Sequence, residues 1–280
     1  MRAQDVNALD APQPRHDQEK ATVTKQNLTA LKTIARREIA RILRIWGQTL
    51  VPPAITMTLY FLIFGSLIGA RIGEMGGFSY MDFIVPGLVM MSVIQNAYGN
   101  ISSSFFGAKF GRHVEELLVS PMPNWVILGG YVAGGVLRGL MVGVIVLVIA
   151  MFFTQVRVPH PLVTLSTVLL GATIFSLAGF VNAVYAKKFD DIAIIPTFIL
   201  TPLTYLGGVF YSVRVLPDWA ETATHLNPIF YMVNAFRYGL LGETAIDMPL
   251  WTAYAVMLAF VVVLTWLALH LLTKGVGLRS

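Results

Sequence analysis

The residues that could perform chemistry in this chain of 280 residues are few and dispersed. Glu115 and Glu116 are adjacent carboxylates, but the Leu-Leu-Val-Ser that follows them supplies no histidine for a hydrolytic site. The sequence contains no cysteine, no H-E-x-x-H and no G-x-S-x-G. Its five histidines, at positions 16, 113, 160, 225 and 270, are too scattered to favour a metal cluster. We therefore predict no catalytic, cofactor-binding or metal-binding residues.

The sequence also lacks an energy source for transport. A phosphate-binding P-loop requires G-x-x-x-x-G-K-[ST], and no Gly-Lys pair occurs anywhere in the chain. Carriers driven by protons or sodium usually keep a carboxylate within the bilayer. The nearest carboxylate here is Asp82, at the mouth of an apolar run rather than inside it. These absences disfavour both a nucleotide site and an ion-coupled carrier.

The composition indicates a membrane protein. Apolar residues make up 56% of the chain and charged residues 12%, about half the charged share of soluble domains. The mean hydropathy is +0.68. Nine of the 20 Lys and Arg residues lie within positions 1–49, which fits an anionic cytoplasmic leaflet better than nucleic acid.

Charge-free runs of about 20 residues mark where the chain could cross ~30 Å of hydrocarbon. We predict six transmembrane helices, at about 50–70, 83–107, 128–155, 160–185, 192–213 and 249–272. With both termini in the cytoplasm, 15 Lys and Arg residues lie inside and four outside, in agreement with the positive-inside rule. Arg138, the one charge within a predicted span, either snorkels to the cytoplasmic edge or faces an aqueous path.

Two segments before and between these spans have other patterns. Residues 1–27 are predicted to be a disordered cytoplasmic tail, and residues 28–48 an interfacial amphipathic helix. The apolar face of this helix is predicted to contain Leu31, Ala35, Ile39, Ile42 and Trp46. Its basic face is predicted to contain Lys32, Arg36, Arg37, Arg41 and Arg44.

The region before the last span does not fit a simple loop. Residues 222–236 are a charge-free run of 15 residues that contains Pro228, too short to cross a bilayer comfortably. We predict an outer re-entrant helical hairpin with its turn near Leu226–Pro228. Glycines spaced by four, at 135, 139 and 143, favour close packing of the third span, either within the chain or between subunits. The fold class is therefore an all-α membrane protein of six spans, with one domain over residues 28–280.

Several motifs taken together resemble the ABC-2 type export permeases, over roughly residues 28–280. They are Leu-Asn-Pro-Ile-Phe-Tyr-Met-Val-Asn-Ala-Phe-Arg-Tyr-Gly-Leu-Leu-Gly at 226–242, Gly-Gly-Val-Phe-Tyr-Ser at 207–212, Leu-Pro-Asp-Trp at 216–219 and Glu-Glu-Leu-Leu-Val-Ser-Pro at 115–121. Trp-Gly-Gln-Thr-Leu-Val-Pro-Pro at 46–53, Phe-Ile-Val-Pro-Gly at 83–87 and Lys-Phe-Asp-Asp at 188–191 are similar to the YadH-like branch of Gram-negative bacteria.

The resemblance implies a homodimer in the bacterial inner membrane that works with two copies of a separate cytoplasmic ABC ATPase, which binds the ATP and Mg. It implies ATPase-coupling roles for Arg36, Arg37, Glu115, Glu116, Leu117, Leu118, Phe189, Asp190 and Asp191. It implies a translocation path lined by the first and fifth spans, which on this sequence contain Tyr60, Phe61, Phe64, Pro202, Tyr205 and Phe210. The re-entrant motif that caps this path contains Asn227, Pro228, Phe236 and Arg237.

We therefore expect the membrane-spanning permease subunit of an ATP-driven exporter. Its aromatic, polar-poor spans favour a lipid-linked, amphipathic or drug-like substrate that leaves the cytoplasm. One alternative is a channel or ion-coupled carrier that acts without an ATPase, and flux through liposomes by the chain alone would favour it. Another is a membrane anchor, which would bind a cytosolic partner without changing ATP hydrolysis.

Overall fold

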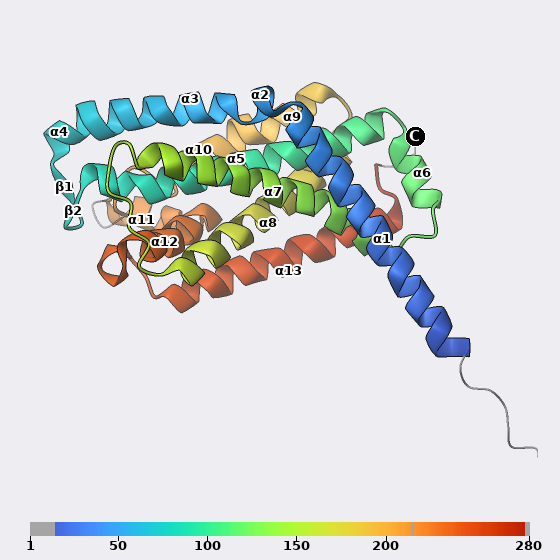
Figure 1. The fold of residues 1–280 in the computed structure, drawn as a ribbon. Coiled ribbons are helices and arrows are strands. Elements are labelled where there is room, and N and C mark those ends of the chain that lie inside the picture. Colours follow the sequence, from blue (N-terminus) through green and yellow to red (C-terminus); the bar gives the residue numbers. More distant parts are fainter. Residues whose placement is uncertain (1–14, 214–215, 278–280) are drawn as a thin grey trace, which may run out of the picture.

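The computed structural model describes residues 15–213 and 216–277, and this part of the chain is mostly helical (Figure 1). The long helices are α1 (Arg15–Arg44), α5 (Tyr80–Phe110), α7 (Asn124–Ala150), α8 (Pro161–Tyr185), α12 (Pro228–Leu241) and α13 (Leu250–Lys274). The shorter elements are α2 (Trp46–Thr49), α3 (Val51–Tyr60), α4 (Gly69–Ile72), α6 (His113–Val119), α9 (Phe189–Ile195), α10 (Thr201–Tyr205), α11 (Asp218–His225), the strands β1 (Glu74–Met75) and β2 (Phe78–Ser79), and the 3₁₀ turn Glu243–Ala245. Two π-helical segments, η1 (Phe61–Ile68) and η2 (Pro196–Leu200), continue α3 and α9.

Four helical stretches among the described residues are long and apolar enough to cross a membrane. They are Trp46–Ile72, Asn124–Ala150, Pro161–Tyr185 and Leu250–Lys274. Each corresponds to a predicted span, although α7 begins and ends a few residues before the predicted 128–155. The count of six spans stays a prediction.

The second predicted span, α5, is enclosed by protein. It packs against α7 and α8 along its length and has 20 buried residues. Glycines of α7 allow this close approach: an added Cβ at Gly143 would lie 2.8 Å from Val93 Cγ2, and one at Gly135 would lie 3.1 Å from the Ala97 carbonyl oxygen. The glycine spacing of the third span therefore serves packing within the chain.

Helix α1 crosses one end of the bundle at a steep angle and packs against α7 (Figure 1). It begins at Arg15, so residues 15–27, predicted as a disordered tail, are helical, while residues 1–14 lie outside the described part. The predicted apolar face is correct for Ile42, which is buried, and for Leu31, Ala35 and Ile39, which are half-buried, but it is wrong for Trp46. Trp46 is 60% exposed, and the buried face of α1 consists of Ile34, Glu38 and Ile42.

The fifth predicted span, 192–213, is shorter in the structure. Its helical part runs from Phe189 to Tyr205, and residues 206–213 form an irregular turn. Gly208 has a φ of +74°, a conformation that favours glycine and ends the helix. The prediction of a helix to Val213 followed hydropathy alone, which does not register such a turn.

The predicted break near Leu226–Pro228 is confirmed. Helix α11 ends at His225, and α12 begins at Pro228, a residue suited to the first position of a helix because it has no N–H to satisfy. The Asn227 side chain caps α12 by accepting a hydrogen bond from the Ile229 N–H at 3.0 Å.

Candidate functional site

The predicted main coupling segment forms the short helix α6, directly after α5. Val114 is buried and holds the helix against the bundle, while Glu115 and Glu116 are exposed in its first turn. Leu117 and Leu118 are half-buried. Helix α6 therefore presents two carboxylates to solvent from a base fixed by apolar contacts.

The second predicted coupling segment lies against the same end of α5. The Phe189 ring makes edge contacts with Phe106 and Phe110, at centroid distances of 4.9 and 5.1 Å. Asp190 is exposed next to it. Since α6 follows Phe110 within a few residues, the end of α5 supports both α6 and the beginning of α9, and two segments more than 70 residues apart in sequence share one base.

Polar contacts hold this end of the molecule in place. Asp191 Oδ2 accepts hydrogen bonds from the backbone N–H groups of Lys187 and Lys188 at 2.8 and 2.9 Å, and these bonds lower the pKa of the carboxyl group. Lys109 Nζ donates to the carbonyl oxygens of Val184 and Ala186 at 2.6 and 2.7 Å, which satisfies the end of α8. Burial lowers the pKa of this lysine.

The two arginines of α1 that were predicted to couple differ in their surroundings. Arg36 is exposed. Arg37 Nη2 donates to the Tyr131 hydroxyl at 2.7 Å, and its guanidinium carbon lies 5.5 Å from the centre of that ring. Arg36 is thus available to another molecule, while Arg37 also binds α1 to α7.

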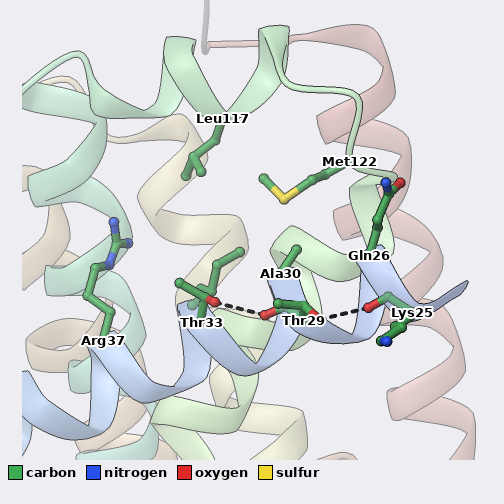
Figure 2. A pocket seen from close by; sticks show the side chains of 9 residues that line it. Lys25, Gln26, Thr29, Ala30, Thr33, Arg37, Leu117 and Met122 are labelled. Atoms are coloured by element: carbon green, nitrogen blue, oxygen red, sulfur yellow. Dashed lines mark hydrogen bonds between the residues drawn. The ribbon is translucent and has the colours of Figure 1, made fainter. Parts of the chain in front are cut away.

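A groove separates α1 from α6. It encloses about 580 Å³, and Thr29, Thr33 and Arg37 contribute to its α1 side. Figure 2 shows Leu117 and Met122 pointing toward α1 from the opposite side. The predicted coupling residues Arg37 and Leu117 therefore face one shared hollow.

Four of the six predicted path residues lie together beside the second half of the first predicted span. The ring centroids of Phe64 and Phe210 are 4.9 Å apart, and those of Tyr205 and Phe210 are 5.7 Å apart. The Tyr60 and Tyr205 hydroxyl oxygens are 2.7 Å apart and share a hydrogen bond. We call Tyr60, Phe64, Tyr205 and Phe210 the aromatic cluster.

The other two predicted path residues lie elsewhere. Phe61 is fully buried and stacks on Phe153 at 5.5 Å, away from the cluster. Pro202 is exposed on α10. Successive residues of a helix point in directions about 100° apart, so adjacent aromatics such as Tyr60 and Phe61 do not share a face.

The residues of the predicted re-entrant motif make several contacts within the chain. Asn227 Nδ2 donates to the Leu203 carbonyl oxygen at 2.6 Å, in addition to its capping bond. Phe236 is fully buried, and Arg237 is 1% exposed. The Arg237 guanidinium lies 3.9 Å from the centre of the Phe83 ring and donates to the Gly208 carbonyl oxygen at 2.8 Å. The motif therefore joins α12 to α5 and to the turn after α10.

Sequence reasoning missed one charged residue. Glu38 is 2% exposed, accepts from Ser104 Oγ at 2.6 Å and pairs with Arg41 at 3.0 Å. The sequence signal that would have identified this pair is the spacing of Glu38 and Arg41 by three residues, with Glu38 on the stripe of Ile34 and Ile42.

Comparison with known proteins agrees with these features. The sequence model of the family described as ABC-2 type transporter matches residues 29–241. The chain belongs to the ABC-2 type transporter family. It is 59% identical, over 251 residues, to the inner membrane transport permease YadH of Escherichia coli strain K12, which covers 90% of this chain and 97% of that protein.

More distant relatives are nodulation proteins. Nodulation protein J of Rhizobium leguminosarum bv. trifolii is 25% identical over 190 residues, 68% of this chain and 72% of that protein. Nodulation protein J of Sinorhizobium fredii strain NGR234 is 26% identical over 205 residues, 71% of this chain and 78% of that protein. The family assignment confirms the predicted resemblance, the membrane location and the prediction that this ABC-2 chain is a permease component rather than an ATPase.

Proposed function

We propose that this chain is the permease subunit of an ATP-driven exporter in the bacterial inner membrane. Two copies, each with six spans and both termini in the cytoplasm, would work with two copies of a cytoplasmic ABC ATPase. The substrate would be lipid-linked, amphipathic or drug-like, and it would leave the cytoplasm. The observation that carries this proposal is the convergence of α6, the start of α9 and α1 at one end of the bundle.

The surface at that end has the composition of a protein contact. Phe110, Val119 and Phe189 are 65%, 87% and 55% exposed, close to the carboxylates of Glu116 and Asp190 in sequence. Exposed apolar side chains that gather beside charged ones are typical of an interaction site. We call this set, with Glu115, the coupling surface.

The coupling surface would transmit motion because it rests on α5. Helix α5 has more buried residues than any other described helix and packs against both α7 and α8, so a displacement of its end by a bound ATPase would reach those helices through packed contacts. The aromatic cluster lies beside the second half of the first predicted span. It would separate or close as α3 and α10 move relative to each other.

The first test is a pull-down of the tagged chain from its native membrane in mild detergent. The proposal expects an ABC ATPase subunit in equal copy number. A folded preparation without an ATPase, together with flux by the chain alone in liposomes, would instead support a channel or an ion-coupled carrier.

The second test places the contact on α6. Glu115→Ala combined with Glu116→Ala is expected to weaken ATPase binding by about tenfold or more, since truncating contact residues costs about 1 kcal/mol or more each at an interface. Glu74→Ala removes an exposed carboxylate at the opposite end of the first predicted span and is the matched control. If the Glu115→Ala, Glu116→Ala variant and the Glu74→Ala control bind the ATPase equally well, α6 does not belong to the coupling surface.

A further inference from the structure

A second hollow, distinct from the α1–α6 groove, lies between the last turns of α1 and the last turns of α5. It encloses about 440 Å³, within the range of about 300–1,000 Å³ that small-ligand sites occupy. Its polar lining is contributed by Arg37, Arg41, Arg44, Ser103, Ser104 and His113. Three arginines face one carboxylate, that of Glu38, so the lining carries excess positive charge.

The single carboxylate is already engaged. Glu38 Oε2 accepts from Ser104 Oγ at 2.6 Å and from Arg41 Nη2 at 3.0 Å, and Oε1 lies 3.7 Å from Arg37 Nη2. Gly134 of α7 permits this burial, because an added Cβ there would lie 2.6 Å from Glu38 Cβ. Glu38 thus pairs with Arg37 and Arg41 and leaves the charge of Arg44 uncompensated.

Arginine donors remain unused at this hollow. Arg41 makes all its hydrogen bonds through Nη2, which also donates to Asn100 Oδ1 at 2.8 Å. Its Nε is buried and has no partner among the described residues. Within the same part of the chain, the Arg44 guanidinium forms no ion pair or hydrogen bond. The exposed Arg44 guanidinium is therefore the donor group that a bound anion can reach directly.

The surroundings favour a lipid as the source of that anion. Leu43 and Trp46, on either side of Arg44 in sequence, are 54% and 60% exposed, and Trp is enriched where a protein meets the lipid headgroups. Lys109 follows the hollow directly on α5, where the positive-inside rule predicts the cytoplasmic face. Planar guanidinium groups match phosphate oxygens in geometry and charge.

We propose that this hollow binds the phosphate group of an anionic phospholipid from the cytoplasmic leaflet. Arg41, fixed by Glu38 and Asn100, and the unpaired Arg44 hold the phosphate, and the acyl chains lie toward the exposed Leu43 and Trp46. The site is a property of this chain alone and requires neither the ATPase nor a transported substrate.

Native mass spectrometry of the full chain in detergent, titrated with phosphatidylglycerol or phosphatidylcholine, tests the proposal. Phosphatidylglycerol is expected to bind more tightly than the zwitterionic lipid. Arg44→Gln is expected to weaken phosphatidylglycerol binding by about fivefold, the effect of about 1 kcal/mol per basic residue near a membrane surface. Arg44→Lys is expected to restore part of the loss.

Arg36→Gln is the matched control, since it removes the same charge from an exposed position of the same helix that does not line the hollow. Equal losses in Arg36→Gln and Arg44→Gln would overturn the site in favour of diffuse surface charge. Displacement of the lipid by equimolar sn-glycerol 3-phosphate would overturn the lipid source in favour of a soluble phosphate ester. Arg44 is exposed, so its variant folds even where an Arg41 variant does not.

Discussion

The hydroxyl groups of Tyr60 and Tyr205 share a hydrogen bond of 2.7 Å across 145 positions of sequence. Tyr60 is the last residue of α3 before the π-helical segment η1, and Tyr205 is the last residue of α10. The contact therefore joins the first and fifth predicted spans at the points where their regular α-helix ends. π-Helical segments often occur at functional sites, and this pair lies beside one.

The hydroxyl pair is expected to influence transport more than folding. Tyr60→Phe and Tyr205→Phe each remove one hydroxyl of the hydrogen bond, which lowers the stability of the contact by about 1 kcal/mol. In a double-mutant cycle, the transport rate of the double variant is expected to fall no further than that of either single variant. The reason is that each single substitution already removes the same hydrogen bond. Tyr254→Phe, which loses a hydroxyl contact to Ser166 between α13 and α8, is the control and is expected to transport normally. Additive effects would show that the hydroxyls act separately.

Arg237 is expected to stabilise the fold. Arg237→Met leaves the Gly208 carbonyl oxygen without its donor and removes the stacking on Phe83. We expect a loss of about 2 kcal/mol in the free energy of unfolding, in the range for a hydrogen bond from a charged group. Thermal unfolding in detergent measures it. Arg157→Met, at an exposed arginine, is expected to change little, and a comparable loss there would argue against a specific role for Arg237.

Replacement by alanine is expected to have opposite effects on the free energy of unfolding at two glycines, Gly179 and Gly99. At Gly179, an added Cβ would lie 2.6 Å from the Tyr98 carbonyl oxygen, so Gly179→Ala is expected to cost about 1–3 kcal/mol through overpacking. At Gly99, nothing lies within 4 Å, so Gly99→Ala is expected to be neutral or to stabilise by up to about 1 kcal/mol. Denaturant unfolding of both variants in the same detergent measures the sign of the change in the free energy of unfolding. Destabilisation by Gly99→Ala would contradict the packing described here.

Asp191 is expected to hold the beginning of α9 in a manner that depends on pH. Backbone hydrogen bonds lower its folded pKa below the usual value of 3.8, so its stabilising effect is present above that value and disappears as the pH falls through the lowered pKa. At neutral pH, Asp191→Ala is expected to speed amide hydrogen exchange over residues 189–195.

Asp190→Ala is the control for this effect, because Asp190 is exposed and its side chain makes no such bonds with the part of the chain that the structure describes. It is expected to leave the exchange unchanged. On acidification the wild-type chain is expected to approach the exchange rates of Asp191→Ala. Identical amide hydrogen exchange in Asp191→Ala and Asp190→Ala at neutral pH would show that Asp191 does not cap α9.

Several predictions depended only on residues close together in the sequence, and these agree with the structure. The apolar runs located α7, α8 and α13 to within a few residues. Pro228, in a charge-free run too short to span, predicted the break between α11 and α12, because a proline at the start of a helix acts within one turn. The motifs in order also predicted the ABC-2 family, which the comparison confirmed.

Which faces of the helices pack against one another was decided only by the tertiary structure. Ile34 and Glu38 of α1 lie against Gly130 and Gly134 of α7, where an added Cβ would lie 2.5 and 2.6 Å from those side chains. Hydropathy assigned Trp46 to the buried face and gave no place to Glu38, because the burial of a charge depends on partners such as Ser104 that lie far away in the sequence. By itself, the sequence determined the long apolar helices, the lack of a P-loop motif and the family, since these follow from composition and the local order of residues. The tertiary structure alone brought Tyr60 to Tyr205 and Glu38 to Arg41 and Ser104, since such contacts depend on how the helices pack.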